Sequence, residues 1–406
     1  MDNNRVLFTN KLKCCGCEMC AESCPRGVIQ MRPDEEVFFY PVIAQPEKCI
    51  NCNICSRLCP VQNIGDIASE FRYAVSGWTK SKEMLAKSSS GGFATALSLE
   101  FLKAGGIVYG VAYTSDYRGA EYIRADDIDE IEKLRTSKYV QSRKKKIYHT
   151  LECDLKNQRN VLFIGVPCDC AAVKIRFKSY DNLSIVSLIC HGPTTQIVQQ
   201  QICQDIEDKF VSEIDDFSVR YKMNGCWKPY YLYAHLKSGE TYCEKWDNTS
   251  YNAAFLHLKR PSCNNCVFKE GHFAADLLIG DFHAARVGME AYNEGGVSSI
   301  LVLTDRGEKL LDDVKSTMDI FPVPLSQATH QRAVHSSYPA KLDRKLFSIT
   351  LQKKGAISAS RLWSVKLDKC WVRVKDRAMV RGSKAKAKIY GVIKKWRENK
   401  GEAEQH

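Results

Sequence analysis

The stretch CCGCEMCAESCP, residues 14–25, places five cysteines within twelve positions. Four of these cysteines are followed by Pro25 and have the spacing C-x2-C-x2-C-x3-C: Cys14, Cys17, Cys20 and Cys24. The same spacing, again followed by proline, returns 35 positions later: Cys49, Cys52, Cys55 and Cys59. This internal repeat indicates which type of module the N-terminal residues form.

Two such runs, each ending before proline, are the ligand pattern of bacterial two-cluster ferredoxins, in which the last cysteine ligates the other cluster. We therefore predict two [4Fe–4S] clusters with exchanged fourth ligands. The first is assigned to Cys14, Cys17, Cys20 and Cys59. The second is assigned to Cys49, Cys52, Cys55 and Cys24. A structural zinc site pairs two C-x2-C elements, so zinc does not explain two runs of four cysteines. Cys15 does not fit the repeated spacing and is interpreted as a spare cysteine.

The composition is that of a soluble protein with reduced thiols. The chain has 406 residues, of which 44% are hydrophobic and 26% charged, enough for two or three domains. No apolar run approaches the roughly 20 residues of a membrane helix, and the start, MDNNRVLFTNKLK, lacks the apolar stretch of a signal peptide. Nineteen cysteines without such a signal favour metal binding over disulfides. We expect a cytoplasmic protein.

Beyond the cysteine-dense module, expected over residues 1–66, short apolar runs alternate with helical patterns. This alternation predicts an α/β body over residues 70–335. Buried strands are expected at 105–113, 160–168, 183–192, 275–282 and 296–304. The predicted fold therefore combines α+β and α/β parts: a ferredoxin-like module, an α/β body and a basic tail over residues 341–406.

The tail holds the excess of positive charge. The whole chain has 59 Lys or Arg and 47 Asp or Glu, and residues 341–406 contain 19 of the former and 6 of the latter. Aromatic residues interleave with these cations, as they do on surfaces that bind polyanions. No nucleic-acid motif accompanies them, so we expect docking on an acidic protein or an anionic membrane surface rather than on nucleic acid.

A second set of cysteines lies in the predicted body. Cys168 and Cys190 each follow an apolar strand, and Cys263 and Cys266 form the segment PSCNNC. Open α/β sheets place ligand sites beyond the carboxyl ends of their strands, so these thiols favour a third cluster. Separate buried thiols beside a small zinc knuckle explain the spacing equally well. Cys170 is a competing ligand.

Two further segments are candidates for cofactor binding. KSSSGGFATALSLEFLKAGG, residues 87–106, predicts a Ser/Gly loop that opens a helix, which suits a phosphate or pyrophosphate. Serine is also an ordinary helix cap, however, and Gly–Gly an ordinary turn. RTSKYVQS, residues 135–142, gathers hydroxyls, an amide and a cation, or is a solvated loop. His191, in CHGP, is a candidate proton donor, or it orients its loop.

Taken in order behind the two-cluster module, SSSGG, SKYVQS, GVPCDCAAV, CHGP, RPSCNNCVFK and ADLLIGDF resemble the coenzyme F420 hydrogenase/dehydrogenase beta subunit family over about residues 10–335. The resemblance implies an FAD-binding α/β body with its own [4Fe–4S] cluster. It implies electron exchange between clusters and flavin, and with a deazaflavin or another small organic acceptor. The cluster ligands it implies are Cys168, Cys190, Cys263 and Cys266. The FAD-binding residues it implies are Ser89, Ser90, Gly91, Gly92, Ser137, Tyr139, Gln141 and Ser142.

The chain departs from the family pattern at three places. GVPCD replaces GTPCQ, Thr136 replaces the glycine before SKYVQS, and GDFH replaces GDFW. These changes leave the cysteines intact and the acceptor undetermined. Our first hypothesis is a flavin-dependent iron–sulfur oxidoreductase with a redox partner protein or ferredoxin-type electron donor. The alternative is an electron-relay subunit without its own substrate, and an iron–sulfur nucleic-acid protein has only the basic tail in its support.

The three assignments together predict about 12 irons per chain, as three cubanes of four. Protein purified without oxygen should be brown, and iron and acid-labile sulfide analysis should return that stoichiometry. Stoichiometric zinc with negligible iron would overturn the cluster assignments.

Overall fold

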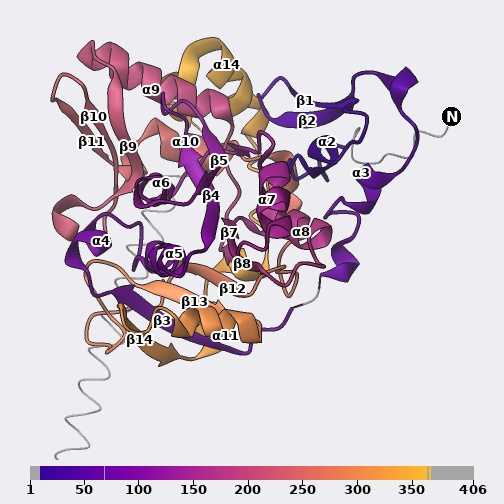
Figure 1. Ribbon diagram of the computed structural model, residues 1–406. Coiled ribbons are helices and arrows are strands. Elements are labelled where there is room, and N and C mark those ends of the chain that lie inside the picture. The colour runs from indigo at the N-terminus through magenta and orange to yellow at the C-terminus, as the bar shows by residue number, and fades with distance from the viewer. Residues whose placement is uncertain (1–9, 68, 364, 367–406) are drawn as a thin grey trace, which may run out of the picture.

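The computed structural model describes residues 10–67, 69–363 and 365–366. Its largest element is a nine-stranded mixed sheet in the order β14-β3-β13-β12-β8-β7-β4-β5-β6 (Figure 1). The strands are β3 (Tyr73–Thr79), β4 (Ile107–Tyr113), β5 (Ala120–Ala125), β6 (Ser142–Arg143), β7 (Val161–Gly165), β8 (Leu183–Leu188), β12 (Leu277–Asp281), β13 (Ser298–Val302) and β14 (Met318–Val323). The predicted mixed α/β fold of the body is confirmed.

The middle of this sheet is parallel. β4, β7, β8 and β12 run in one direction, while β5 and β13 flank them antiparallel. Both faces are covered, so β7 reads as a continuous apolar run. Phe163 packs with α7 (Ile147–Lys156) and α8 (Pro167–Arg176) on one face. Leu162, its neighbour in the strand, packs with α5 (Phe93–Lys103) and α11 (Asp305–Asp312) on the other.

Each of the five predicted strands contains a strand of this sheet: β4, β7, β8, β12 and β13. The strand expected at 160–168 ends earlier than predicted. β7 stops at Gly165, and Pro167 begins α8 because proline fits the first turn of a helix, where its missing N–H is not needed. Cys168 therefore lies in the first turn of a helix.

A second sheet stands beside the first. It consists of the antiparallel strands β9 (Ile214–Tyr221), β10 (Tyr231–Leu236) and β11 (Thr241–Lys245). α9 (Gln196–Phe210), α10 (Ser250–His257) and α14 (Arg344–Ser360) pack with it around a separate apolar core. The shorter helices are α4 (Lys82–Ala86), α6 (Ile128–Leu134), α12 (Leu325–Ala328) and α13 (Arg332–His335).

The cysteine-rich module lies at one end of the molecule, coloured indigo in Figure 1. It contains the hairpin β1 (Ile29–Pro33) and β2 (Phe39–Ile43) and the single-turn helices α2 (Met19–Glu22) and α3 (Ile54–Arg57). Met19 is fully buried and joins Cys17 in the apolar cluster built from α7 and α8. The module thus shares a core with the body on its α2 side.

Part of the predicted basic tail, residues 367–406, lies outside the described residues. The tail region that is described, up to Lys366, includes α14. Among the described residues, no helix is both long enough and apolar enough to cross a membrane.

A buried ion pair supports the surface on which the module sits. The Lys144 ammonium lies 3.1 Å from the Asp169 carboxylate, and each side chain is 2% exposed. The Tyr122 hydroxyl donates a 3.0 Å hydrogen bond to the same carboxylate. The backbone N–H of Lys144 donates to Glu18 of the module at 3.4 Å.

Replacing Lys144 by alanine should therefore leave a buried carboxylate without its cation and cost about 3–5 kcal/mol of stability. Lys145 offers a matched control, because its side chain is 61% exposed and its ion-pair partner Glu121 keeps 24% of its surface in contact with solvent. Lys145→Ala should change stability by no more than about 1 kcal/mol. Thermal unfolding of the iron-loaded protein measures both variants, and equal midpoints would contradict this role of the buried pair.

Candidate functional site

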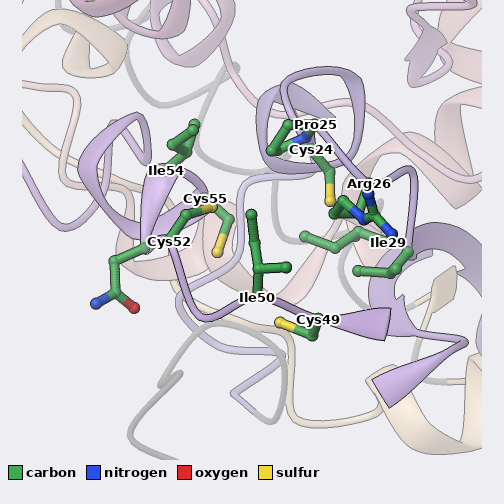
Figure 2. Close-up of a pocket in the computed structure, with 11 residues that line it drawn as sticks. Cys24, Pro25, Arg26, Ile29, Cys49, Ile50, Cys52, Ile54 and Cys55 are labelled. Carbon is green, nitrogen blue, oxygen red and sulfur yellow. The ribbon is translucent and has the colours of Figure 1, made fainter. Parts of the chain in front are cut away.

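The eight cysteines of the repeat line two separate cavities. One cavity of about 340 Å³ is lined by Cys15 and by four thiols of the repeat, drawn from both runs: Cys14, Cys17, Cys20 and Cys59. The other, of about 370 Å³, is lined by the remaining four: Cys24, Cys49, Cys52 and Cys55. Figure 2 shows the Cys24 segment facing the loop of Cys49–Cys55 across this second space. We call the four repeat cysteines at the first cavity the inner quartet and the four at the second the outer quartet; each quartet holds the cysteines assigned to one predicted cluster, and the exchange of fourth ligands stays a prediction.

The backbone repeats along with the cysteines. Gly16 and Asn51, which are 35 positions apart, both have positive φ, and so do Glu18 and Asn53. Left-handed conformations are uncommon for residues other than glycine. Their recurrence at matched positions indicates that each run needs the same tight loop, which directs its first three thiols to one side.

The donor set fits a cubane better than a single ion. Within the described residues, no three His, Cys, Asp or Glu side chains approach closely enough to hold one metal ion. Zinc requires four sulfurs at about 2.3 Å from one centre. A cubane carries its irons at separate corners, so its ligands stand farther apart around a larger space. Four thiols around each cavity satisfy that requirement.

The inner quartet faces the body. Cys14, Cys17 and Cys59 are only 6–7% exposed, whereas every cysteine of the outer quartet is half-buried. The Tyr148 hydroxyl of α7 donates a 2.8 Å hydrogen bond to the carbonyl of Cys17. The Gln141 amide donates to the carbonyl of Cys15 at 3.3 Å.

The second cysteine set gathers at the carboxyl ends of adjacent parallel strands. Cys168 follows β7 and Cys190 follows β8, while Cys263 lies in the 3₁₀ turn η5 (Pro261–Asn265) and Cys266 ends it. Burial raises the pKa of the Cys263 thiol, and the neighbouring Cys190 and Cys266 raise it further. The N–H of Gly192 donates to Cys190 Sγ at 3.3 Å, and an added Cβ on this glycine would lie 3.2 Å from Cys263 Sγ.

Cys15 lies between the inner quartet and this body set. Hydrogen bonds from Cys168 and Cys17 hold the pKa of its thiol well below the usual value. The cysteine that the sequence leaves as a spare is therefore positioned at the contact between two thiol groups. Cys170, the predicted competitor, turns away: it is fully buried, and its thiol donates to the carbonyl of Val186 in β8.

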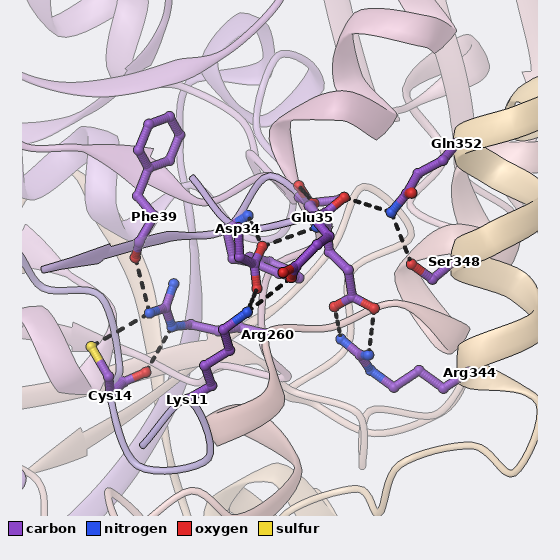
Figure 3. Close-up of polar contacts among 12 residues, drawn as sticks. Lys11, Cys14, Asp34, Glu35, Phe39, Arg260, Arg344, Ser348 and Gln352 are labelled. Carbon is purple, nitrogen blue, oxygen red and sulfur yellow. Dashed lines mark hydrogen bonds and ion pairs between the residues drawn. The ribbon is translucent and has the colours of Figure 1, made fainter. Parts of the chain in front are cut away.

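Polar contacts tie the β1–β2 hairpin to the body (Figure 3). Arg344 of α14 forms two hydrogen bonds with the carboxylate of Glu36, one of them 2.7 Å long. Arg260 is fully buried and donates to the carbonyls of Cys14 at 2.8 Å and Phe39 at 3.1 Å. Sequence reasoning missed Arg260, although its place just before a cysteine-bearing turn was a usable signal.

Some of the residues predicted to bind FAD do come together. The backbone N–H of Ser137 donates to the Ser89 hydroxyl at 2.9 Å. The buried Arg220 donates to the Ser89 carbonyl at 2.9 Å, to Asp281 at 2.8 Å and to the Tyr139 hydroxyl at 3.3 Å. These segments therefore meet around one guanidinium group.

Other residues of the predicted FAD set also make packing contacts within the protein. The Gln141 amide is directed at the Cys15 loop, and Ser142 begins β6. An added Cβ on Gly91 would lie 2.2 Å from the Gly77 carbonyl oxygen. Gly92 has a φ of +84° as the N-cap of α5. Both glycines are explained by close backbone packing, whether or not a phosphate approaches them.

The protein surroundings of His191 favour the neutral imidazole. Burial, followed by the charges of Lys259 and Lys269, lowers the pKa of His191 to about 4. Its ring lies 5.3 Å from that of Tyr338. The role of His191 as a proton donor stays a prediction.

Family models match most of the described chain. Residues 13–63 match the 4Fe-4S dicluster domain. Residues 74–147 match the N-terminal model of the coenzyme F420 hydrogenase/dehydrogenase beta subunit, and residues 158–324 match its C-terminal model. The protein is thus an iron–sulfur electron-transfer protein with a ferredoxin-type domain on a mixed α/β body. The chain belongs to the coenzyme F420 hydrogenase/dehydrogenase beta subunit family, whose members are oxidoreductase subunits.

Comparison with solved structures finds a chain of the F420-reducing [NiFe] hydrogenase complex from Methanosarcina barkeri, in a xenon-derivatised form. The identity is 18% and the TM-score 0.45, with 72% of this chain and 91% of that chain covered. Comparison with curated protein sequences gives no match.

The exchanged ligands lead to a test by iron counting. Cys24→Ala and Cys55→Ala should each cost about four irons, because both residues serve the outer quartet, and the double variant should lose no more than either one. Cys20→Ala combined with Cys55→Ala should cost about eight irons, since these two cysteines serve different quartets. If Cys24→Ala and Cys55→Ala had additive losses, the exchange would be wrong.

Proposed function

We propose that this chain is a flavin-dependent iron–sulfur oxidoreductase that passes electrons between [4Fe–4S] clusters and FAD, and to or from a small organic acceptor such as a deazaflavin. The observation that carries the proposal is the position of Cys15, which lines the inner cavity with Cys17 and packs in the same apolar cluster as Cys168 of the body set. Clusters supply single electrons and flavins accept one or two, so the two cofactors suit each other.

The chain's own residues hold and shield these groups. The inner and outer quartets would bind the two clusters of the module. A third cluster would be bound by Cys168, Cys190, Cys263 and Cys266, whose mutual proximity supports the assignment. No disulfide joins the described cysteines, which supports cluster ligation and the proposed cytoplasmic location.

For FAD, the segment Ser89–Gly92 and the residues Ser137 and Tyr139 remain the proposed contacts. A buried cation beside this segment would stabilise a bound anion. Lys222 is 4% exposed, and its ammonium donates to the carbonyls of Leu85 at 2.6 Å and Ser90 at 2.7 Å. Burial, and then the charge of Arg220, lowers the pKa of Lys222 to about 7. A phosphate beside Ser90 would restore the charged form of this lysine.

The alternative, a relay subunit serving a partner enzyme, has one observation in its favour. The surface around the outer quartet exposes Ile50, which is 60% accessible, among three exposed cations: Arg26, Lys48 and Arg57. Such a surface suits an acidic redox partner, including a ferredoxin-type donor. Oxidation of the reduced flavin by a small acceptor alone would support the enzyme; oxidation only by a partner protein would support the relay. Anionic docking through the basic tail also remains a proposal.

Lys222→Met should empty the FAD site, because a neutral side chain cannot offset the charge of a phosphate placed beside Ser90. Lys228→Met is the matched control, since Lys228 is exposed and lies over the Trp227 ring, 4.4 Å from its centroid. FAD released from anaerobically purified protein is measured by chromatography, with iron content and thermal midpoint confirming that each variant is folded. Full FAD content in Lys222→Met would refute the placement, and wild-type protein without flavin would refute the proposed function.

A further inference from the structure

Arg260 contacts both thiol groups that Cys15 separates. Its backbone N–H donates to the Pro193 carbonyl, and its own carbonyl accepts a 2.9 Å hydrogen bond from the N–H of Cys263. The main chain of Arg260 therefore opens the turn that carries the body thiols. Its side chain extends the other way, into the ferredoxin-type module (Figure 3).

The guanidinium group is held by the module and by Gln141 of the body. It donates to the carbonyl oxygens of Cys14 and Phe39, to Gln141 Oε1 at 2.9 Å and to Cys14 Sγ at 3.5 Å. Its central carbon lies 4.2 Å from the centre of the Tyr40 ring. An arginine with four oriented contacts and no solvent exposure has one conformation available to it.

This buried cation needs a negative charge. Arginine stays protonated in proteins, and an isolated buried charge is strongly unfavourable. Among the described residues, its hydrogen-bond partners include no carboxylate. The acidic group that it touches is the Cys14 thiol, which becomes an anionic thiolate when it ligates iron. A metal-bound inner quartet thus provides the missing counter-charge.

We propose that Arg260 is a positioning residue that fixes the Cys14 loop to the body and makes the cluster of the inner quartet easier to reduce. Reduction adds negative charge beside a fixed cation, and hydrogen bonds to ligand sulfurs are among the factors that set cluster potentials. The inference rests on the proposed function only in requiring a cluster in the inner quartet. It is independent of flavin and substrate.

Redox titration of the full-length, iron-loaded protein, followed by electron paramagnetic resonance, tests this role. Arg260→Gln should lower one midpoint potential, weakening reduction of that cluster about tenfold, which is about 59 mV for one electron. Arg260→Lys keeps the charge and should remain closer to the wild type. Arg344→Gln is the matched control, because Arg344 joins the same hairpin to the body through Glu36 and its hydrogen bonds involve no cysteine. Cys20→Ser marks which signal belongs to the inner quartet.

An unchanged inner midpoint in Arg260→Gln would overturn the proposal, and so would an equal shift in Arg344→Gln, which would make it a general effect of loosened docking. If Arg260→Gln loses about four irons, the Arg260→Lys variant decides whether the positive charge matters. Retained iron with a near-native midpoint potential supports the role of the charge. Loss of the same irons refutes it. These titrations give their answer even if the protein binds no flavin, so failure of the proposed function would be recognised separately.

Discussion

Each quartet of thiolates must converge on one cluster from segments that are distant in sequence, and this constraint determines how the N-terminal part is built. In the predicted exchange, the fourth ligand of each quartet comes from the other run, so that neither run forms a complete site alone. The left-handed residues at matching positions, Gly16 with Asn51 and Glu18 with Asn53, direct the thiols inward. The hairpin β1–β2 connects the two runs. The body must therefore present a surface that fits a module whose shape is determined by its two clusters.

The matching uses buried polar groups in addition to the apolar contacts of Met19. Lys144 and Asp169 form a buried ion pair, the backbone N–H of Lys144 donates to Glu18, and Arg260 donates to the carbonyl of Cys14. Such groups are costly to bury and tolerate little displacement, so they fix orientation more strictly than apolar contacts do. A fixed orientation of the module on the body keeps the distance between the inner quartet and the body cysteines constant.

The sequence predicted those features that depend on spacing or on continuous apolar runs. The gathering of the repeat cysteines at two cavities follows from the C-x2-C-x2-C-x3-C spacing, and the five predicted strands are rich in apolar residues because the sheet is covered on both faces. β3, β5, β6, β14 and the β9–β11 sheet were missed; a half-exposed strand such as β11 gives a weak pattern. The environment of Cys15 and the reach of Arg260 could not be predicted either. They depend on how two separately folded parts meet, which local patterns do not encode.

The exchange of fourth ligands also ties the fates of the two clusters together when oxygen attacks. The outer quartet is half-buried and meets oxidants first. Oxidative loss of its iron would free Cys24, which ends the same run that supplies Cys14, Cys17 and Cys20 to the inner quartet. It would equally loosen the run of Cys49, Cys52 and Cys55, from which the inner quartet takes Cys59. Damage at the exposed end would therefore loosen the two loops that hold the sheltered cluster, although it removes none of that cluster's own ligands.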